Sequence, residues 1–292
     1  MAFDRIAVLG AGAWGTALAT VAARPGRRVT LWSRNPAEAA AMADARENRR
    51  SLPGVRLDDA IIPTASHDYL AAADLVLLVV PAQHLRATLD ALPPLGPGVP
   101  VVLCAKGIEA GTGLLMSEVL AACRPGHPAA ALSGPSFAAD VGRGRPTAVT
   151  VAAEDGDLAR RVAEALAKPA FRPYHADDLR GVEIGGAAKN VLAIACGVAA
   201  GMELGASAAA ALIARGFAEL ARFGIEGRHL RSFRTAAERE VGLFSQVVGP
   251  IAKHRNAEAR SRAEETVREL VALSVRLHAA LVQIGLRGVV TG

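Results

Sequence analysis

Three glycines near the amino terminus have the spacing that binds a dinucleotide phosphate. Gly10, Gly12 and Gly15 follow an apolar run at residues 6–9 and precede an alanine-rich helical pattern. In a strand, turn and helix of this kind, the first glycine permits the sharp turn, the second lets the backbone approach a pyrophosphate, and the third lets the helix pack on the strand. The N–H groups at the helix start then face an anion. The pattern predicts nucleotide binding. The alternative is an ordinary structural turn.

Two later stretches place anion-binding groups after apolar runs. Residues 101–106 read as a buried strand that delivers Lys106 at its carboxyl end, where ligands of open α/β sheets bind. Ser136 follows another short apolar run, just before a helical pattern that starts at Phe137, and predicts a second anion-binding turn. The alternatives are a solvated strand end for Lys106 and an ordinary capped helix start for Ser136.

A lysine stands inside a segment that otherwise reads as a buried helix. Residues 185–200 are rich in small and apolar side chains, yet they carry Lys189 and Asn190. An ammonium group buried without partners is costly, so proteins pair it or lower its pKa, and both properties suit a catalytic lysine. The alternative is a surface lysine whose charged end reaches the solvent.

The residues after the second predicted strand bear on the choice of cofactor. Residues 28–32 alternate as a short strand that leads into Ser33 and Arg34. An acidic residue there would bind a ribose hydroxyl and repel a 2′-phosphate, whereas these two side chains offer hydrogen-bond donors and a positive charge. We therefore expect NADPH to be preferred, with NADH as a second cofactor. The alternative is that Arg34 is only a solvated residue at the start of a loop.

These residues need a framework of alternating strands and helices. Residues 71–81 read as a helix end followed by a continuously apolar strand, which is typical of the centre of a parallel sheet. Residues 48–54 read as a loop, and from Gly181 onward the pattern changes to long helices. The prediction is an α/β fold, with a Rossmann-like doubly wound sheet domain at residues 1–180 and an all-helical domain at residues 181–292.

Composition limits the class of protein. The chain has 292 residues, of which 51% are hydrophobic, and this is enough for a sizeable core and two domains. The formal charge is +5, and residues 225–292 supply +4 of it through ten Arg, one Lys and seven Glu. Without a recognised binding module, this distribution does not predict a nucleic-acid partner.

Neither membrane insertion nor a metal is expected. No basic amino-terminal segment leads into an apolar run with a cleavage site, and the apolar runs are broken by Gly, Arg or Asp before they reach membrane-spanning length. A cytoplasmic location follows by default. Cys104, Cys123 and Cys196 lack the spacing of metal ligands or of a CxxC motif, so we expect reduced cysteines that lie mostly in the core.

Several ordered stretches together resemble the bacterial NAD(P)H-dependent glycerol-3-phosphate dehydrogenases. They are GAGAWGTALA from Gly10, VVPAQHLR, CAKGIEAGTG from Cys104, LSGPSFAADVGRGRPTAV from Leu132, and EIGGAAKNVLAIACG through ALIARGFAEL. They span residues 1–224 with little interruption, which makes the resemblance far more specific than a glycine pattern alone.

The resemblance implies reversible hydride transfer between NAD(P)H and dihydroxyacetone phosphate, which yields sn-glycerol 3-phosphate for phospholipid synthesis. It implies Lys189 as the catalytic lysine, able to stabilise negative charge on the ketone oxygen and to protonate it. The implied substrate-binding positions are Lys106, Gly134, Ser136 and Asn190. The implied cofactor-binding positions are Gly10, Gly12, Ala13, Trp14, Gly15, Arg34, Lys106 and Ala138. A homodimer is a further expectation.

The resemblance ends at Gly224. The family continues with a GLGDL-type motif and a serine-arginine-asparagine motif, whereas residues 225–292 contain no aspartate. Residues 242–246 (GLFSQ) stand near the expected place of the first motif, and Arg255-Asn256 echoes the second. Residues 264–281 read as a helix with a broad apolar face. Either divergence of this domain or a change of reading frame in the gene explains the difference.

Three functions remain open from the sequence. The first is an NADPH-dependent glycerol-3-phosphate dehydrogenase. The second, which follows from the altered tail, is a dinucleotide-binding protein with little or no turnover. The third keeps the fold and acts on another small 2-oxo or 3-hydroxy compound.

Overall fold

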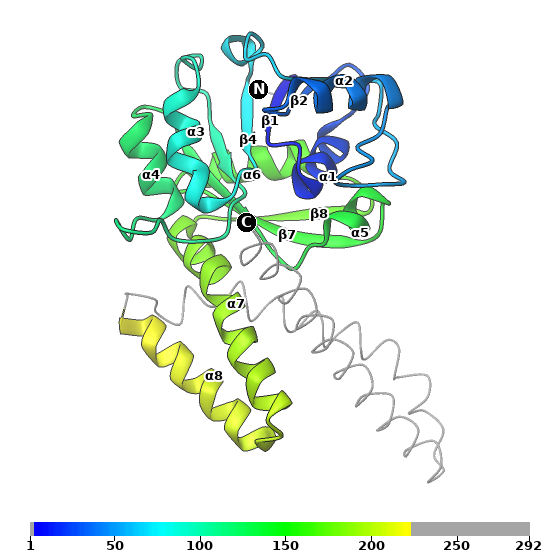
Figure 1. Ribbon diagram of the computed structural model, residues 1–292. Helices are drawn as coiled ribbons and strands as arrows, with labels where there is room; N and C mark the ends of the chain where they lie inside the picture. The colour runs from blue at the N-terminus through cyan, green and yellow to red at the C-terminus, as the bar shows by residue number, and fades with distance from the viewer. Residues whose placement is uncertain (1–2, 223–292) are drawn as a thin grey trace. The chain divides into compact units, whose positions relative to one another are not determined.

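The computed structural model describes residues 3–222, and the chain divides into two compact units, Met1–Gly186 and Ala187–Gly292. The predictions made for residues 242–246, for Arg255-Asn256 and for a helix at 264–281 lie outside the described residues. In the first unit, strands and helices alternate around one sheet (Figure 1).

One sheet of eight strands forms the centre of the first unit. The strands are β1 (Arg5–Leu9), β2 (Arg28–Trp32), β3 (Ile61–Thr64), β4 (Leu75–Leu78), β5 (Val101–Leu103), β6 (Ala129–Ser133), β7 (Thr147–Ala152) and β8 (Phe171–Ala176). Their order is β3-β2-β1-β4-β5-β6-β7-β8, and all neighbours from β3 to β6 are parallel. β7 is antiparallel to β6, and β8 is parallel to β7. The strand order reverses between β1 and β4, where doubly wound sheets bind their ligands, and the predicted fold class is confirmed.

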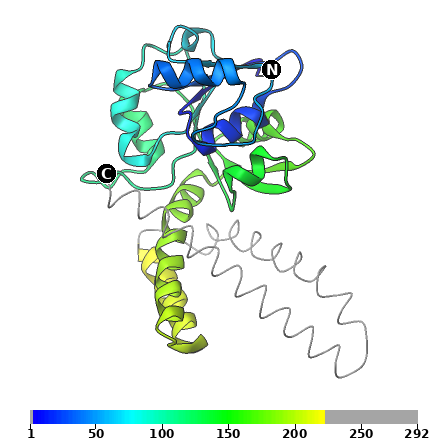
Figure 2. The same ribbon diagram turned by 45° about the vertical axis from the view of Figure 1, so that its right-hand side comes forward.

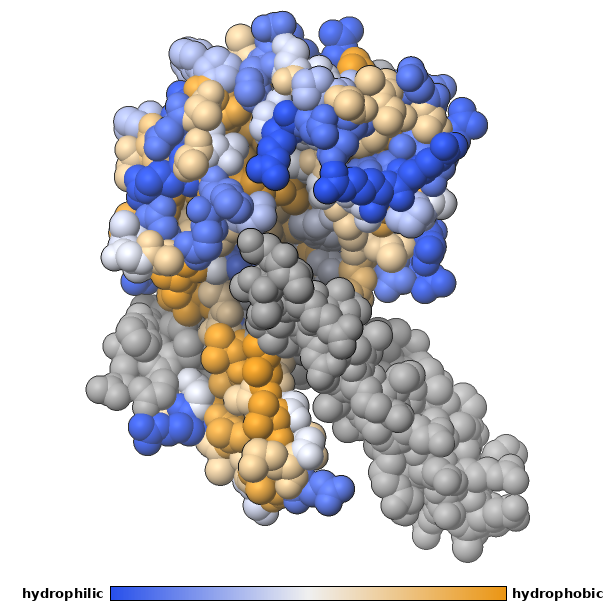
Figure 3. All heavy atoms as spheres, viewed as in Figure 1, coloured by the Kyte–Doolittle hydropathy of each residue, from blue (hydrophilic) through white to orange (hydrophobic). Residues whose placement is uncertain are grey.

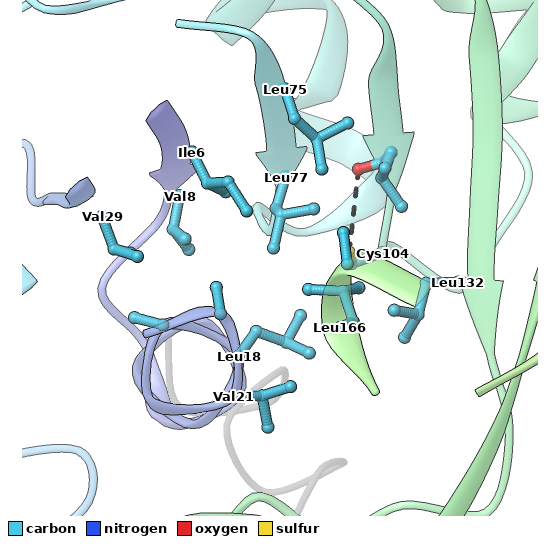
Figure 4. Packing of buried hydrophobic residues seen from close by; sticks show 14 of the residues in the cluster. Ile6, Val8, Leu18, Val21, Val29, Leu75, Leu77, Cys104, Leu132 and Leu166 are labelled. Atoms are coloured by element: carbon cyan, nitrogen blue, oxygen red, sulfur yellow. Dashed lines mark hydrogen bonds between the residues drawn. The ribbon is translucent and has the colours of Figure 1, made fainter. Parts of the chain in front are cut away.

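Helices lie on both faces of this sheet (Figure 1 and Figure 2). They are α1 (Ala13–Ala22), α2 (Pro36–Ala45), α3 (Leu85–Ala91), α4 (Met116–Cys123), α5 (Ala138–Gly142) and α6 (Gly156–Leu166), with short 3₁₀ turns at Leu70–Ala72 and Ala82–His84. In β1, Ile6 and Val8 join a buried cluster that includes Leu18 of α1 (Figure 4). Ala7 and Leu9 alternate with them and join a second cluster with side chains of α3 and α4. Burial of both faces explains why β1, β4 and β5 read as continuous apolar runs.

Basic side chains cap the carboxyl ends of α1 and α6. Arg27 Nη1 donates hydrogen bonds to the carbonyl oxygens of Ala22, at 2.9 Å, and Ala165, at 2.8 Å. Lys168 Nζ donates to the carbonyl oxygen of Thr20 at 2.6 Å. The last carbonyls of a helix lack intrahelical partners and carry partial negative charge, so these cations stabilise both helix ends.

The long helix α7 (Leu179–Gly201) starts in the first unit and is anchored there by Glu183. The buried carboxylate of Glu183 accepts hydrogen bonds from Ser117 N, at 2.8 Å, and from Ser117 Oγ, at 2.5 Å, in the first turn of α4. Burial raises the pKa of this carboxyl, and the two hydrogen bonds oppose the rise. The contact fixes the first turns of α7 against α4.

In the second unit, α8 (Gly205–Arg222) packs closely on the later part of α7. A Cβ at Gly216 of α8 would overlap the side chain of Leu192 on α7, so the two helices meet through a glycine. Apolar side chains are exposed on these helices, with Val191 at 66% and Val198 at 55% on α7 (Figure 3).

One helix of the described residues meets the length and composition of a membrane span. It is α7, with 23 residues and a mean hydropathy of 1.4 in the tested window. The sequence analysis expected no apolar run of that length. Core helices of proteins outside membranes meet the same criterion, so α7 is weak support for a span.

Candidate functional site

The glycine-rich turn between β1 and α1 is shaped by close contacts with neighbouring backbone. Gly10 has a φ of +116°, which other residues rarely adopt, and a Cβ there would overlap the carbonyl oxygen of Val79, just after β4. Gly15, in the first turn of α1, faces the carbonyl oxygen of Gly10, which a Cβ would also overlap. These contacts account for glycine at both positions.

Gly12 differs from Gly10 and Gly15 because no neighbouring atoms crowd it and the residue is exposed. It is the residue before α1, with φ −70°, and a Cβ there would meet nothing within 4 Å. No side chain caps the start of α1. The first N–H groups of a helix lack partners within the helix and carry its positive end, so an anion can approach them here. Ala13 and Trp14, the first residues of α1, are partly buried against the core.

Asn48 lies behind the turn and was not among the site residues predicted from the sequence. Its side chain is buried, and its Nδ2 donates hydrogen bonds to the carbonyl oxygen of Ala11 and to Oγ1 of Thr16, each at 2.8 Å. Its Oδ1 accepts the N–H of Ser51 at 3.1 Å. An asparagine that opens a loop often bonds nearby backbone in this way, and that is the only signal that could have found it.

The end of β2 carries both signs of charge. Arg34 is exposed directly after the buried Ser33. Ser33 Oγ donates to Glu38 Oε2 at 3.3 Å, and the other carboxylate oxygen of Glu38 pairs with Arg50. The sequence predicted only donors and positive charge here. The structure adds a carboxylate from α2, and Arg50 offsets its charge.

Lys106, Gly134 and Ser136 come together at the carboxyl ends of β5 and β6. Lys106 Nζ donates to the carbonyl oxygen of Gly134 at 3.3 Å, and Ser136 Oγ donates to the same oxygen at 3.5 Å. A Cβ at Gly134 would lie 3.0 Å from Cα of Val149 on β7, so the close approach of β7 requires glycine. An exposed ammonium group beside a hydroxyl group can bind a phosphate or a carbonyl oxygen.

A clamp from α3 and from the 3₁₀ turn before it holds the loop that follows Lys106. Arg86 donates from Nε and Nη2 to the two carboxylate oxygens of Glu109, each at 2.9 Å. The hydrogen bonds from Arg86 lower the pKa of Glu109 to about 2. Gln83 Nε2 donates to the carbonyl oxygen of Ile108, and Gln83 Oε1 accepts the N–H of Ala110, both at 2.9 Å. Sequence reasoning missed this clamp, because its halves lie 23 or more residues apart.

Ala138 begins the short helix α5, which packs against α1. It is partly buried against the same core cluster as Ala13 and Trp14. The predicted cofactor positions therefore lie in α1 and α5 and in the segments that follow β1, β2 and β5.

Lys189 and Asn190 lie on α7 and belong to the second unit. Lys189 is half-buried. Gly186 is the last residue of the first unit and lies close to the cluster of Lys106, Gly134 and Ser136, which we call the Lys106 corner. A Cβ at Gly186 would lie 2.9 Å from Oγ of Ser133 and 3.8 Å from Cγ of Lys106. The first unit therefore gathers one of the two predicted lysines.

Residues 3–222 contain no group of three His, Cys, Asp or Glu side chains placed to hold a metal ion. All three cysteines are free. Cys104 is buried, and burial raises its pKa to about 12, whereas Cys123 and Cys196 are half-buried. Only one of the three lies fully in the core.

Known proteins match most of the chain. A family model described as NAD-dependent glycerol-3-phosphate dehydrogenase N-terminus matches residues 5–159. A glycerol-3-phosphate dehydrogenase (NAD(P)+) of Azorhizobium caulinodans is 62% identical over 224 residues, which cover 76% of this chain and 68% of the relative. The chain belongs to the glycerol-3-phosphate dehydrogenase family. It is thereby a member of an NAD(P)-dependent oxidoreductase family, as the resemblance predicted.

Solved structures of this family share the fold. The glycerol-3-phosphate dehydrogenase of Coxiella burnetii is 36% identical with a TM-score of 0.70, and the match covers 78% of this chain and 72% of that chain. The Plasmodium falciparum enzyme is 25% identical with a TM-score of 0.69, over 76% of this chain and 66% of that chain. A second family model, described as Rv1828-like, C-terminal domain, matches residues 201–290. The carboxyl-terminal sequence is therefore similar to a domain of another family.

Proposed function

We propose that the chain catalyses reversible hydride transfer between NAD(P)H and dihydroxyacetone phosphate, with sn-glycerol 3-phosphate as the reduced product used for phospholipid synthesis. Membership of the glycerol-3-phosphate dehydrogenase family supports this reaction. The observation that carries it is the shared sheet edge: the glycine-rich turn and the Lys106 corner both follow the carboxyl ends of parallel strands. The first suits a dinucleotide pyrophosphate, and the second suits a small phosphate ester.

The turn fits the cofactor because Gly12 leaves open backbone at a helix start. When bound, the nicotinamide supplies or accepts the hydride, and the protein supplies binding and orientation. Ala13, Trp14 and Ala138 complete the proposed contacts. Arg34 would bind a 2′-phosphate, which makes NADPH the preferred cofactor and NADH the second. No metal takes part in the proposed reaction.

Reduction of the substrate ketone requires that the negative charge on its oxygen be stabilised and that this oxygen receive a proton. Lys189 stabilises the negative charge that develops on the ketone oxygen and donates the proton to it. Lys106 and Ser136 hold the phosphate or the oxygen end of the substrate. Asn190 and the backbone of Gly134 complete the substrate positions.

The test is NADPH oxidation by purified full-length protein with dihydroxyacetone phosphate. Lys189→Ala should lower kcat by roughly 10²–10⁴-fold, which is the usual range for loss of a general acid. Lys168→Met is the matched control, since its ammonium group caps α1 and takes no part in the proposed site. Equal turnover by wild type and Lys189→Ala would reject the proposed role of Lys189.

A second candidate function is dinucleotide binding with little turnover. It is favoured by the carboxyl-terminal sequence, because the relative matches over 224 residues and a different family model covers residues 201–290. NADPH binding without oxidation, tested with dihydroxyacetone phosphate and with other small 2-oxo compounds, would support it. Turnover that depends on Lys189 would exclude it.

We also propose a cytoplasmic homodimer without membrane insertion. Lys189 within α7 and the close packing of α7 on α8 through Gly216 support the absence of membrane insertion, and the homodimer is carried over from the family resemblance. Sedimentation of the purified protein without detergent tests both points. A dimer in buffer supports the proposal, whereas a requirement for detergent would reject it.

A further inference from the structure

We infer that Asn48 is a positioning residue that aims a backbone N–H of the glycine-rich turn at the pyrophosphate of the dinucleotide. The inference rests on the proposed dinucleotide binding and deepens it. It gives a function to a buried side chain that comes from the loop at residues 48–54, outside the glycine pattern.

The link is the peptide group between Ala11 and Gly12. In a trans peptide the carbonyl oxygen and the following N–H point in opposite directions, and the described backbone has no cis peptide bond. Asn48 lies on the buried side of the turn, and its Nδ2 donates a hydrogen bond of 2.8 Å to the carbonyl oxygen of Ala11. The N–H of Gly12 is therefore directed away from Asn48 and from the buried side of the turn, at a residue that is itself exposed.

The Gly12 N–H is available to an anion. Within residues 3–222, it donates to no backbone or side-chain acceptor. A buried N–H without a partner is costly, but one that faces an open surface can exchange water for a phosphate oxygen. An N–H held in the right direction before binding loses less entropy when the ligand arrives.

Asn48 can hold this direction because both ends of its amide are hydrogen-bonded. Its two Nδ2 hydrogens reach Ala11 and Thr16, and its Oδ1 accepts the N–H of Ser51. These partners belong to the turn, to α1 and to the loop, so rotation of the amide would break bonds to three segments at once. Aspartate has the same shape, but it would place an oxygen against the Ala11 carbonyl oxygen and push that peptide away.

A residue that only supports the fold would affect all ligands of this unit alike. The two roles are separated by comparing NADPH, which has a pyrophosphate, with 2′-AMP, which has the adenosine and the 2′-phosphate but no pyrophosphate. If Asn48 acts through the Gly12 N–H, loss of its side chain weakens the binding of NADPH and leaves the binding of 2′-AMP unchanged.

The experiment is calorimetric titration of full-length wild type, Asn48→Ala and Asn48→Asp with both ligands. We expect Asn48→Ala to raise the Kd for NADPH about tenfold, and Asn48→Asp to raise it further, with the Kd for 2′-AMP within about twofold of wild type. Asp155→Ala is the control, because it removes a side-chain cap of α6 and should change neither Kd. Equal weakening of both ligands, or of neither, would overturn the inference.

A second measurement needs no Asn48 variant and tests the Gly12 contact that the inference requires, even if those variants fail to fold. In wild type labelled with ¹⁵N at glycine, the amide signal of Gly12, identified by its absence in Gly12→Ala, should shift on addition of NADPH or NADH but not of 2′-AMP. If the Gly12 amide signal does not shift on addition of either dinucleotide, the proposed role of Asn48 is overturned. Wild type that binds neither dinucleotide would instead overturn the proposed function, and this inference with it.

Discussion

The glycine-rich turn and the Lys106 corner follow strands at the same edge of the sheet, but they are built from different parts of the chain. The turn is made of backbone atoms in close contact, Gly10 against Val79 and Gly15 against Gly10. The corner is made of side chains: the exposed Lys106 and the half-buried Ser136 reach one carbonyl oxygen through hydrogen bonds of 3.3 and 3.5 Å.

This difference separates stability from affinity. Backbone contacts around the turn leave no room for a side chain, so changes there act on folding first. Exposed side chains at the corner contribute little to folding, so changes there act on ligands first. Gly12 is the exception within the turn, since it alone among the three glycines borders open space.

The largest expected effect comes from a pair of alanine substitutions in the turn. Gly15→Ala should lower the free energy of unfolding by about 3 kcal/mol, because its Cβ would overlap the Gly10 carbonyl oxygen. Gly12→Ala should stay within about 1 kcal/mol of wild type and raise the Kd for NADPH about tenfold or more, because the methyl group takes the place of the anion. Urea unfolding and calorimetric titration measure the two quantities. If Gly15→Ala were as stable as wild type, close packing would not define the turn.

The next effect in size concerns the corner. Lys106→Met should raise the KM for dihydroxyacetone phosphate about 30-fold, the range expected for loss of a hydrogen bond to a charged group. Its melting temperature should match wild type, because the lysine is exposed. Steady-state kinetics and thermal unfolding provide the test, and Lys106→Arg should retain part of the affinity. A lower melting temperature with an unchanged KM would show that the corner is structural.

The contrast also explains how much the sequence could predict. The alternation of strands and helices was readable because β1, β4 and β5 are buried on both faces and appear as apolar runs. The reversed direction of β7 and β8 was not, because direction depends on a pairing that no local pattern records. The edge strands β3 and β8 also contain proline, which weakens a strand signal.

The same holds for the site. The three glycines could be recognised from their spacing, because the turn, the phosphate approach and the helix packing each require a glycine at a fixed position. Asn48 and Glu38 could not be predicted to matter, because their functions depend on partners brought close by folding: Asn48 meets Ala11, 37 residues away. The gathering of Lys106, Gly134 and Ser136 was expected only through the family resemblance, and the structure supplies the shared carbonyl oxygen.

A smaller effect tests whether the corner depends on its support. Arg86→Met removes both hydrogen bonds to Glu109 and should loosen the loop after Lys106, raising the KM for dihydroxyacetone phosphate about tenfold. Arg160→Met, which removes an arginine paired on the surface of α6, is the control and should leave the KM unchanged. An unchanged KM in Arg86→Met would show that the loop needs no clamp.

The clamp also predicts a pH dependence with a definite sign. The pKa of Glu109 is about 2 in the folded protein, whereas an unfolded glutamate has a pKa of about 4.3. Because the folded pKa is the lower one, the pair stabilises the protein above about pH 4.3 and loses this contribution as the pH falls toward 2. The stability difference between wild type and Arg86→Met should therefore shrink between about pH 5 and pH 2 in urea unfolding. A difference independent of pH would contradict the pairing.

The smallest expected effect lies at the end of β2. Unlike the glycine-rich turn, which is built of fixed backbone, this place offers the exposed side chain of Arg34. Arg34→Ala should raise the Kd for NADPH about fivefold and leave the Kd for NADH within about twofold, because an exposed charge contributes about 1 kcal/mol and only to the 2′-phosphate.

Glu38 sharpens this test, because its carboxylate lies near the same strand end and is paired with Arg50. Glu38→Gln should lower the Kd for NADPH by removing a negative charge, which is the opposite direction to Arg34→Ala. Arg160→Ala controls for the loss of one positive charge elsewhere on the surface. Equal effects of Arg34→Ala on the two cofactors would mean that this strand end does not read the 2′-phosphate, and cofactor choice would then rest on groups other than Arg34.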